Sequence, residues 1–288
     1  MMRLAGWRRT DLMLLVALVS LAIAATARTW AEIFGQAIHS EEDSHILMAL
    51  PIAAWLVWLR RGRLRLCRPT WSFLGPAMIA GGVLMERVGL EQALEVFRHA
   101  GVLLIVVGAA ATILGVRFLQ QFIPAFAALV FLIPVPGRIR LEIAVPLQNI
   151  SAHASQFVLD LFGVPVTRSG NELIINGHQV AVAEACNGMR MVTALALISF
   201  AFIFSVPMRN SVRFAVLAVS PLIAVLVNIA RLVPTVLLHG YSSVGLAELF
   251  HDLSGWAALV LALALLWSFL AVLRWIEVRI DPYPVSRR

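Results

Sequence analysis

Three residues whose types could act together in acyl transfer stand far apart in this chain: Cys186, Arg231 and His251. A cysteine thiolate is a nucleophile, a histidine can accept a proton and return it, and a guanidinium can donate two hydrogen bonds to an oxyanion. Each residue also has an ordinary explanation by itself, since most buried cysteines only fill space. The prediction of thiol chemistry therefore depends on the three residues meeting on one side of a membrane.

Cys186 stands where a polar, glycine-containing run meets a long apolar run. We expect Asn187 and Gly188 to form the first turn of the helix that follows, at the outer boundary of the membrane. A thiol near a helix N-terminus feels the positive end of the helix dipole, which lowers its pKa and favours the thiolate. Glu184 and Arg190 flank this turn, and these two residues, like Asn187 and Gly188, are expected to support the site or to bind substrate.

Arg231 lies in the outward half of an apolar stretch, where an arginine costs about 2.5 to 3.5 kcal/mol on insertion scales and is usually functional or paired. The alternative to an oxyanion role is an ion pair with Glu184 or Glu248. Asn228 precedes the arginine by about one helical turn, so we expect it on the same face, orienting the arginine or a peptide backbone.

His251 stands at the outer entrance of the last apolar stretch, where it could take a proton from the thiol and return it to a leaving amine. Its neighbour Asp252 is predicted to be a helix N-cap. The sequence contains no HExxH run and no paired Cys/His spacing, so no metal site and no cofactor are expected.

The elements that must position these residues are membrane helices. The chain is 60% hydrophobic and only 14% charged, with a mean hydropathy of +0.88, which excludes an ordinary soluble globule. Stretches near the roughly 20 apolar residues that a bilayer requires predict an all-α polytopic protein with about eight spans. They cover residues 12–34, 46–59, 73–90, 101–119, 122–135, 191–206, 214–238 and 255–276.

The arginines set the expected orientation, because cytoplasmic loops are enriched in positive charge. Arginines precede the first span, fill the loop after the second, follow the sixth and close the chain. With eight spans all of these segments lie on the cytoplasmic side, as do both termini, and the site lies on the outer side of the inner membrane. This topology accounts for the net charge of +7 without a nucleic-acid partner.

A segment unlike the spans leads to Cys186. After a proline-punctuated break at 134–137, residues 141–162 predict an amphipathic helix at the outer interface, in contact with membrane lipid and ended by Gly163. Three alternating stretches separated by turn residues then predict a small outer β-hairpin or meander that runs into the cysteine. We expect one membrane domain over residues 1–288, made of N-terminal helices (1–135), this outer segment (136–190), core helices (191–276) and a cytoplasmic tail (277–288).

Taken together, these patterns resemble the exosortase/archaeosortase family of membrane transpeptidases. The resemblance is carried by ACNGMR at 185–190, NIAR at 228–231 and HDLSG at 251–255, supported by DSH at 43–45, WLRR at 58–61 and GVPV at 163–166. It implies Cys186 as nucleophile, His251 as acid/base and Arg231 as the group that stabilises the transition state.

The resemblance also implies the substrate. Family members are thought to cleave a C-terminal sorting signal of exported proteins, a Pro-Glu-Pro-like (PEP-CTERM) motif followed by a transmembrane helix and a basic tail, and to transfer or release the product. The chain ends soon after the last span, so the extra domain fused to some relatives is expected as a separately encoded partner from an exopolysaccharide system. The alternative from another class is a non-enzymatic transporter or polysaccharide-export component, in which Arg231 and His251 line a substrate path.

Overall fold

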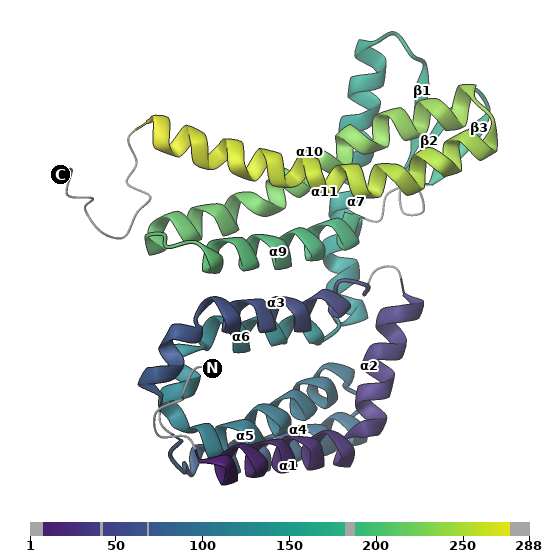
Figure 1. Ribbon diagram of the computed structural model, residues 1–288. Helices are drawn as coiled ribbons and strands as arrows, with labels where there is room; N and C mark the ends of the chain where they lie inside the picture. Colours follow the sequence, from purple (N-terminus) through teal and green to yellow (C-terminus); the bar gives the residue numbers. More distant parts are fainter. Residues whose placement is uncertain (1–7, 41–42, 68, 182–187, 277–288) are drawn as a thin grey trace, which may run out of the picture. The chain divides into compact units, whose positions relative to one another are not determined.

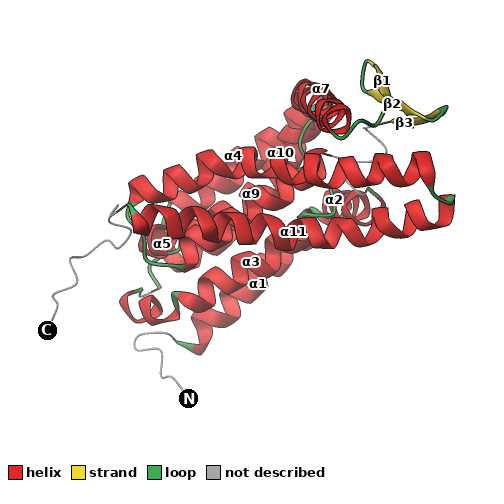
Figure 2. Ribbon diagram, turned by 90° about the horizontal axis from the view of Figure 1, so that it is seen from above, coloured by secondary structure: helices red, strands yellow, loops and turns green. Residues whose placement is uncertain are grey.

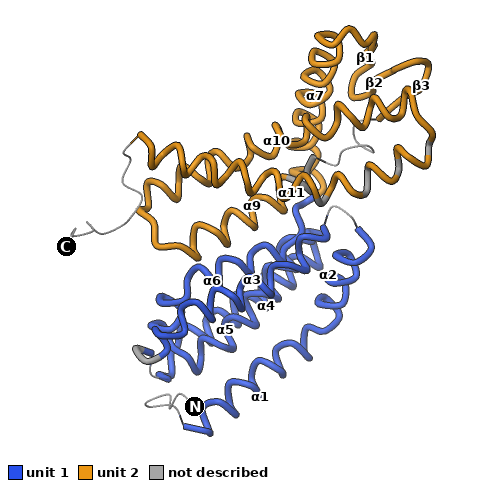
Figure 3. Tube along the Cα trace, turned by 45° about the horizontal axis from the view of Figure 1, so that its top comes forward, with its two compact units in different colours: residues 1–136 blue, residues 137–288 orange. Residues whose placement is uncertain are grey.

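The computed structural model describes residues 8–40, 43–67, 69–181 and 188–276. The chain divides into two compact units, Met1–Pro136 and Gly137–Arg288 (Figure 3). The boundary falls in the proline-punctuated break that the sequence analysis identified. Whether residues 1–288 act as a single domain stays a prediction.

The first unit is entirely helical in its described part (Figure 1). Its α-helices are α1 (Arg9–Ala25), α2 (Ala27–His39), α3 (Ile46–Leu59), α4 (Leu74–Glu91), α5 (Glu95–Gln121) and α6 (Ile123–Ala128), with short 3-10 helices η1 (Arg61–Leu66) and η2 (Leu129–Leu132).

Glycines bring α4 and α5 into close contact. Gly75, Gly82 and Gly89 recur every seven residues on α4 and are buried. A Cβ added at Gly82 would lie 2.6 Å from the backbone oxygen of Gly101 on α5, so only glycine fits there. Small residues let helix backbones approach closely in membranes, where apolar burial gives little driving force between helices.

The first predicted span, 12–34, is not one straight helix. α1 and α2 meet at a bend of 75°. At the bend, the Thr26 hydroxyl donates to the Ala22 carbonyl oxygen at 2.7 Å. Such a back-bond competes with the helical ladder and favours bending.

The number of spans also differs from the prediction. In the described part of the chain, three helical stretches are long and apolar enough to cross a membrane: Glu95–Gln121, Asn210–Tyr241 and Leu253–Trp275. The bent pair α1 and α2 would make a fourth. Every predicted span contains helix, but the count of eight is not confirmed. Ile46–Leu59, Ile123–Leu132 and Val192–Ser205 are shorter than the roughly 20 residues that a bilayer requires, and α4, which carries Glu86, Arg87 and Glu91, is not among the candidate spans.

The second unit contains all the predicted site positions. It comprises α7 (Gly137–Leu161), β1 (Val166–Ser169), β2 (Glu172–Ile175), β3 (His178–Ala181), α9 (Gly188–Ser205), α10 (Asn210–Tyr241) and α11 (Val244–Trp275). The strands form an antiparallel meander in the order β1-β2-β3, as predicted (Figure 2). Asn176 and Gly177 both have positive φ, at 48° and 80°, as expected of an Asn-Gly hairpin turn.

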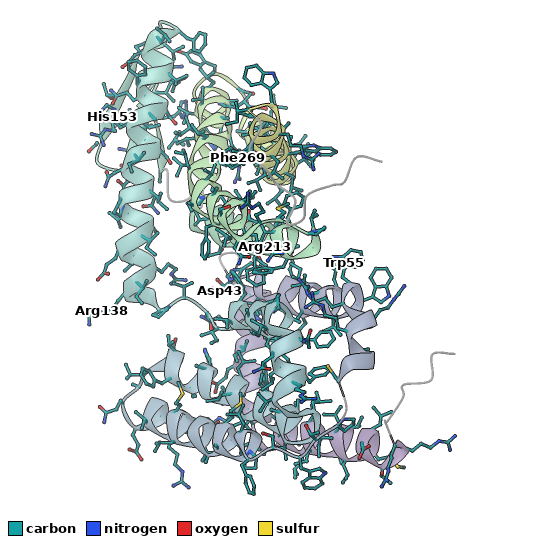
Figure 4. The ribbon with its side chains drawn as sticks, turned by 90° about the vertical axis from the view of Figure 1, so that its left-hand side faces the viewer. Asp43, Trp55, Arg138, His153, Arg213 and Phe269 are labelled. Atoms are coloured by element: carbon teal, nitrogen blue, oxygen red, sulfur yellow. The ribbon has the colours of Figure 1, made fainter. Side chains whose placement is uncertain are left out.

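The predicted amphipathic helix is α7, and Gly163 follows its end with φ of 73°. Exposed apolar residues share one face of α7 (Ile139, Ile143, Ile150, Phe157, Leu161), and exposed polar residues share the adjoining face (Arg138, Glu142, His153, Asp160). Leu141 and Val145 are exposed on the far flank of the polar face. Figure 4 shows Arg138 and His153 projecting away from the neighbouring helices. This division suits a helix at a membrane surface, although its place at the outer interface stays a prediction.

The meander packs on α7 and α10 through one buried face. Leu173 and Ile175 of β2 and Val180 of β3 pack with Leu232 and Val236 of α10. The Asn176 side chain also donates to the Gly240 backbone oxygen at 3.1 Å. The sheet is therefore anchored to α10, the helix that carries Arg231.

Helices α9, α10 and α11 pack together around a second apolar core. Leu195 and Ile203 of α9 meet Val216 and Val227 of α10 and small residues of α11 such as Ala262. α10 and α11, which carry positions 231 and 251, therefore pack against each other.

Candidate active site

Arg231 contacts a residue from a different helix. Its Nε donates a hydrogen bond of 2.9 Å to the Oγ of Ser254 on α11. Arg231 is half-buried and Ser254 is buried. The contact joins positions 23 residues apart in the chain, and Ser254 was not among the site residues predicted from the sequence. The sequence signal that could have identified Ser254 was its spacing, one helical turn after His251.

His251 lies in the same part of α11. Positions three residues apart on an α-helix share a face, so position 251 is one turn before the serine that binds Arg231. The structure therefore brings the backbone positions of the predicted acid/base and of the predicted oxyanion stabiliser to adjoining turns of two packed helices.

The prediction for Asp252 is wrong. α11 begins at Val244 and its N-cap is Ser243, so Asp252 lies inside the helix and not at its start. The helix begins before the apolar stretch, because polar residues such as Glu248 and His251 do not interrupt helical backbone hydrogen bonding.

Cys186, together with Glu184 and Asn187, lies outside the described residues. The elements around it are described: β3 ends at Ala181, and α9 begins at Gly188, two residues after the cysteine. Arg190 occupies the first turn of α9. The expected effect of the α9 dipole on the Cys186 thiol stays a prediction.

Two elements that flank the cysteine also pack against the helix that carries the arginine. Val180 of β3 belongs to the same buried cluster as Leu232, the residue after Arg231. α9 packs along α10. Segments that lie far apart in sequence thus converge on one region of the second unit (Figure 1).

Asn228 connects α10 to α7. Its Nδ2 donates to Ser151 Oγ at 3.3 Å, and both residues are buried. The Asn228 Oδ1 is buried and has no hydrogen-bond partner in the part of the chain that the structure describes. Asn228 thus holds α10 against α7 one turn from Arg231, and its carbonyl oxygen remains a potential acceptor.

Cys67 provides a contrast with the predicted nucleophile. It is 1% exposed, and burial raises the pKa of its thiol, which disfavours the thiolate.

Among the described residues, no three His, Cys, Asp or Glu side chains are grouped as metal ligands would be.

The fold and these contacts define a multi-pass, mostly helical membrane protein with a small sheet beside a polar inter-helix contact. The model of the transmembrane exosortase family matches residues 30–268, most of the chain. The chain therefore belongs to the transmembrane exosortase family, which confirms the resemblance seen in the sequence. Exosortases are known as transpeptidase-like proteins that act on exported proteins with sorting signals. No significant match was found among curated proteins or among solved structures.

Proposed function

We propose that this protein is a cysteine endopeptidase or transpeptidase of the inner membrane that cleaves C-terminal sorting signals of exported proteins. The observation that carries the proposal is the Arg231–Ser254 contact, because it brings Arg231 to the turn of α11 next to His251 in a chain of the exosortase family. Support for Cys186 comes from its sequence position before α9 and beside β3, which packs on α10.

In the proposed reaction, His251 takes the thiol proton and the Cys186 sulfur attacks the scissile carbonyl carbon. The carbonyl oxygen becomes an oxyanion, which the Arg231 guanidinium stabilises by hydrogen bonding and charge. The C–N bond then breaks, His251 gives its proton to the departing amine, and a thioester remains on Cys186.

A second nucleophile resolves the thioester. Water would release the exported protein with a new carboxyl end, and an amine would transfer it to an anchor. In either case His251 accepts the proton of the nucleophile as the C–S bond breaks, and the thiol is regenerated. Arg231 serves both steps because an oxyanion forms in each.

The substrate proposed is a protein with a Pro-Glu-Pro-like motif, a transmembrane helix and a basic tail at its C-terminus. Its helix would dock against the outer ends of α9, α10 and α11. The site would face the outer side of the membrane, with both chain termini in the cytoplasm, following the distribution of arginines.

The test compares Cys186→Ala with Cys67→Ser in cells that express a reporter carrying such a sorting signal. Processing of the reporter, followed by immunoblot at matched enzyme levels, should be lost in Cys186→Ala and kept in Cys67→Ser. A transporter or export component would tolerate Cys186→Ala, so normal processing by that variant would refute the proposal.

A further inference from the structure

We infer that Ser254 is a positioning residue that orients the Arg231 guanidinium for its role at the oxyanion. This inference rests on the proposed function and adds to it a residue that neither the sequence motifs nor the family match identified. The observation that carries it is the inter-helix hydrogen bond from Arg231 Nε to Ser254 Oγ.

The contact is made at the atom that controls the plane of the guanidinium. Nε lies between the side-chain stem and the two terminal nitrogens, so a hydrogen bond at Nε restricts rotation of the planar group. The 2.9 Å distance is that of a good hydrogen bond, and Ser254 is only 7% exposed, so water has little access to replace it. A fixed plane matters because oxyanion donors must already be aimed before the reaction begins.

The partner is a hydroxyl, which carries no charge. A carboxylate at this position would hold the arginine equally well but would neutralise it. At this contact the serine hydroxyl orients the cation without adding a charge of its own.

The same contact fixes α10 relative to α11. Ser254 lies one helical turn after His251, so holding Ser254 against Arg231 also sets the distance between the arginine and position 251. One turn earlier on α10, the buried Asn228–Ser151 hydrogen bond holds the helix against α7. Arg231 therefore projects from a helix that is anchored one turn away, and its Nε is held by Ser254.

The experiment measures cleavage of a synthetic sorting-signal peptide by the full-length protein in detergent, with Ser254→Ala, Ser254→Thr and Ser268→Ala. A hydrogen bond to a charged group typically changes an equilibrium or rate by about ten- to a hundredfold, so we expect kcat of Ser254→Ala to fall by about that factor with KM nearly unchanged. Ser254→Thr keeps the hydroxyl and should recover most of the rate. Ser268→Ala is the matched control on the same helix, because the Ser268 hydroxyl is exposed and donates to the Ala264 carbonyl oxygen in its own turn.

A double-mutant comparison tests whether Ser254 acts through Arg231. In an Arg231→Ala background, Ser254→Ala should lower kcat by less than about twofold further, since the group that it orients is already gone. A full second loss in that background, a change confined to KM, or a Ser254→Thr variant as slow as Ser254→Ala would each overturn the inference.

The proposed function and this inference fail in different ways. If Cys186→Ala cleaves the peptide at the normal rate, the proposed function is wrong whatever Ser254 does. If Cys186→Ala is inactive while Ser254→Ala behaves like Ser268→Ala, the thiol mechanism stands and only the positioning role is wrong.

Discussion

At the scale of single residues, the chemistry proposed here depends on a planar cation held between two helices. Arg231 is half-buried and donates through Nε to Ser254. Lysine carries the same charge but has no Nε donor and no planar fork. A lysine at position 231 would therefore keep the positive charge and remove the planar geometry, so a lysine variant separates the two contributions.

Arg231→Lys should fail nearly as badly as Arg231→Ala. Loss of one preorganised oxyanion donor typically costs about 2.7 to 4 kcal/mol, or roughly a hundred- to thousandfold in rate. Cleavage of the sorting-signal peptide, measured at matched protein concentration, checks this. Near-normal cleavage by the lysine variant would mean that Arg231 supplies only charge.

His251→Ala should block processing at or before the thioester on Cys186, because one imidazole activates the thiol and protonates the leaving amine. His239→Ala is the matched control, since His239 lies on α10 and its Nδ1 is 2.9 Å from the Thr235 backbone oxygen, within its own helix. In vivo processing of the reporter by each variant is the measurement. Loss in His239→Ala with normal processing in His251→Ala would show that the acid/base has been misassigned.

At the scale of secondary-structure elements, close helix packing in the first unit depends on individual glycines. Two adjacent residues of α4 allow a sharp comparison. A Cβ at Gly82 would clash with the Gly101 backbone oxygen at 2.6 Å, whereas a Cβ at Gly81 would meet only Leu104 Cδ2 at 3.8 Å.

Gly82→Ala should destabilise the protein, and Gly81→Ala should not. Forcing a methyl group into a packed contact typically costs about 1 to 3 kcal/mol, while alanine at an open helical position is favoured over glycine. Thermal unfolding in detergent, followed by size-exclusion of the heated protein, measures the difference. Equal melting temperatures for the two variants would mean that α4 and α5 can separate without cost.

At the scale of the whole molecule, the orientation of the chain is the main prediction still to be tested. Residue 71 lies in the predicted cytoplasmic loop, and residue 178 lies in the predicted outer meander. α5 separates them and qualifies as a span. The two positions fall on opposite sides if α4 and α6 both cross the membrane or if neither does.

Single cysteines at these positions report the orientation. Trp71 is 73% exposed and His178 is exposed on β3, so Trp71→Cys and His178→Cys can each be introduced into a Cys67→Ser, Cys186→Ala background. A membrane-impermeant maleimide added to intact spheroplasts should label His178→Cys alone, and both variants after lysis. Labelling of Trp71→Cys alone before lysis would invert the topology and move the proposed site to the cytoplasm.

The sequence by itself determined the class of the protein, the helical stretches, the meander and the three residues of the proposed site. These features are local: apolar runs exclude water-soluble folds, Asn176 and Gly177 favour a tight turn, and a charged residue in an apolar run is conspicuous wherever it is placed. Motif spacing alone was also enough for the family, as the match over residues 30–268 confirms.

Tertiary structure decided the features that depend on contacts between distant residues. The Arg231–Ser254 and Asn228–Ser151 hydrogen bonds join positions 23 and 77 residues apart, and no local pattern specifies either pairing. The sequence prediction missed the bend at Thr26 and the start of α11 at Val244, eight residues before Asp252. Apolar runs show which residues avoid water, but they do not show where a helix begins or bends. The physical reason is the same in each case: hydropathy is a property of the residue, whereas a hydrogen-bond partner is chosen by the packing of the elements that carry it.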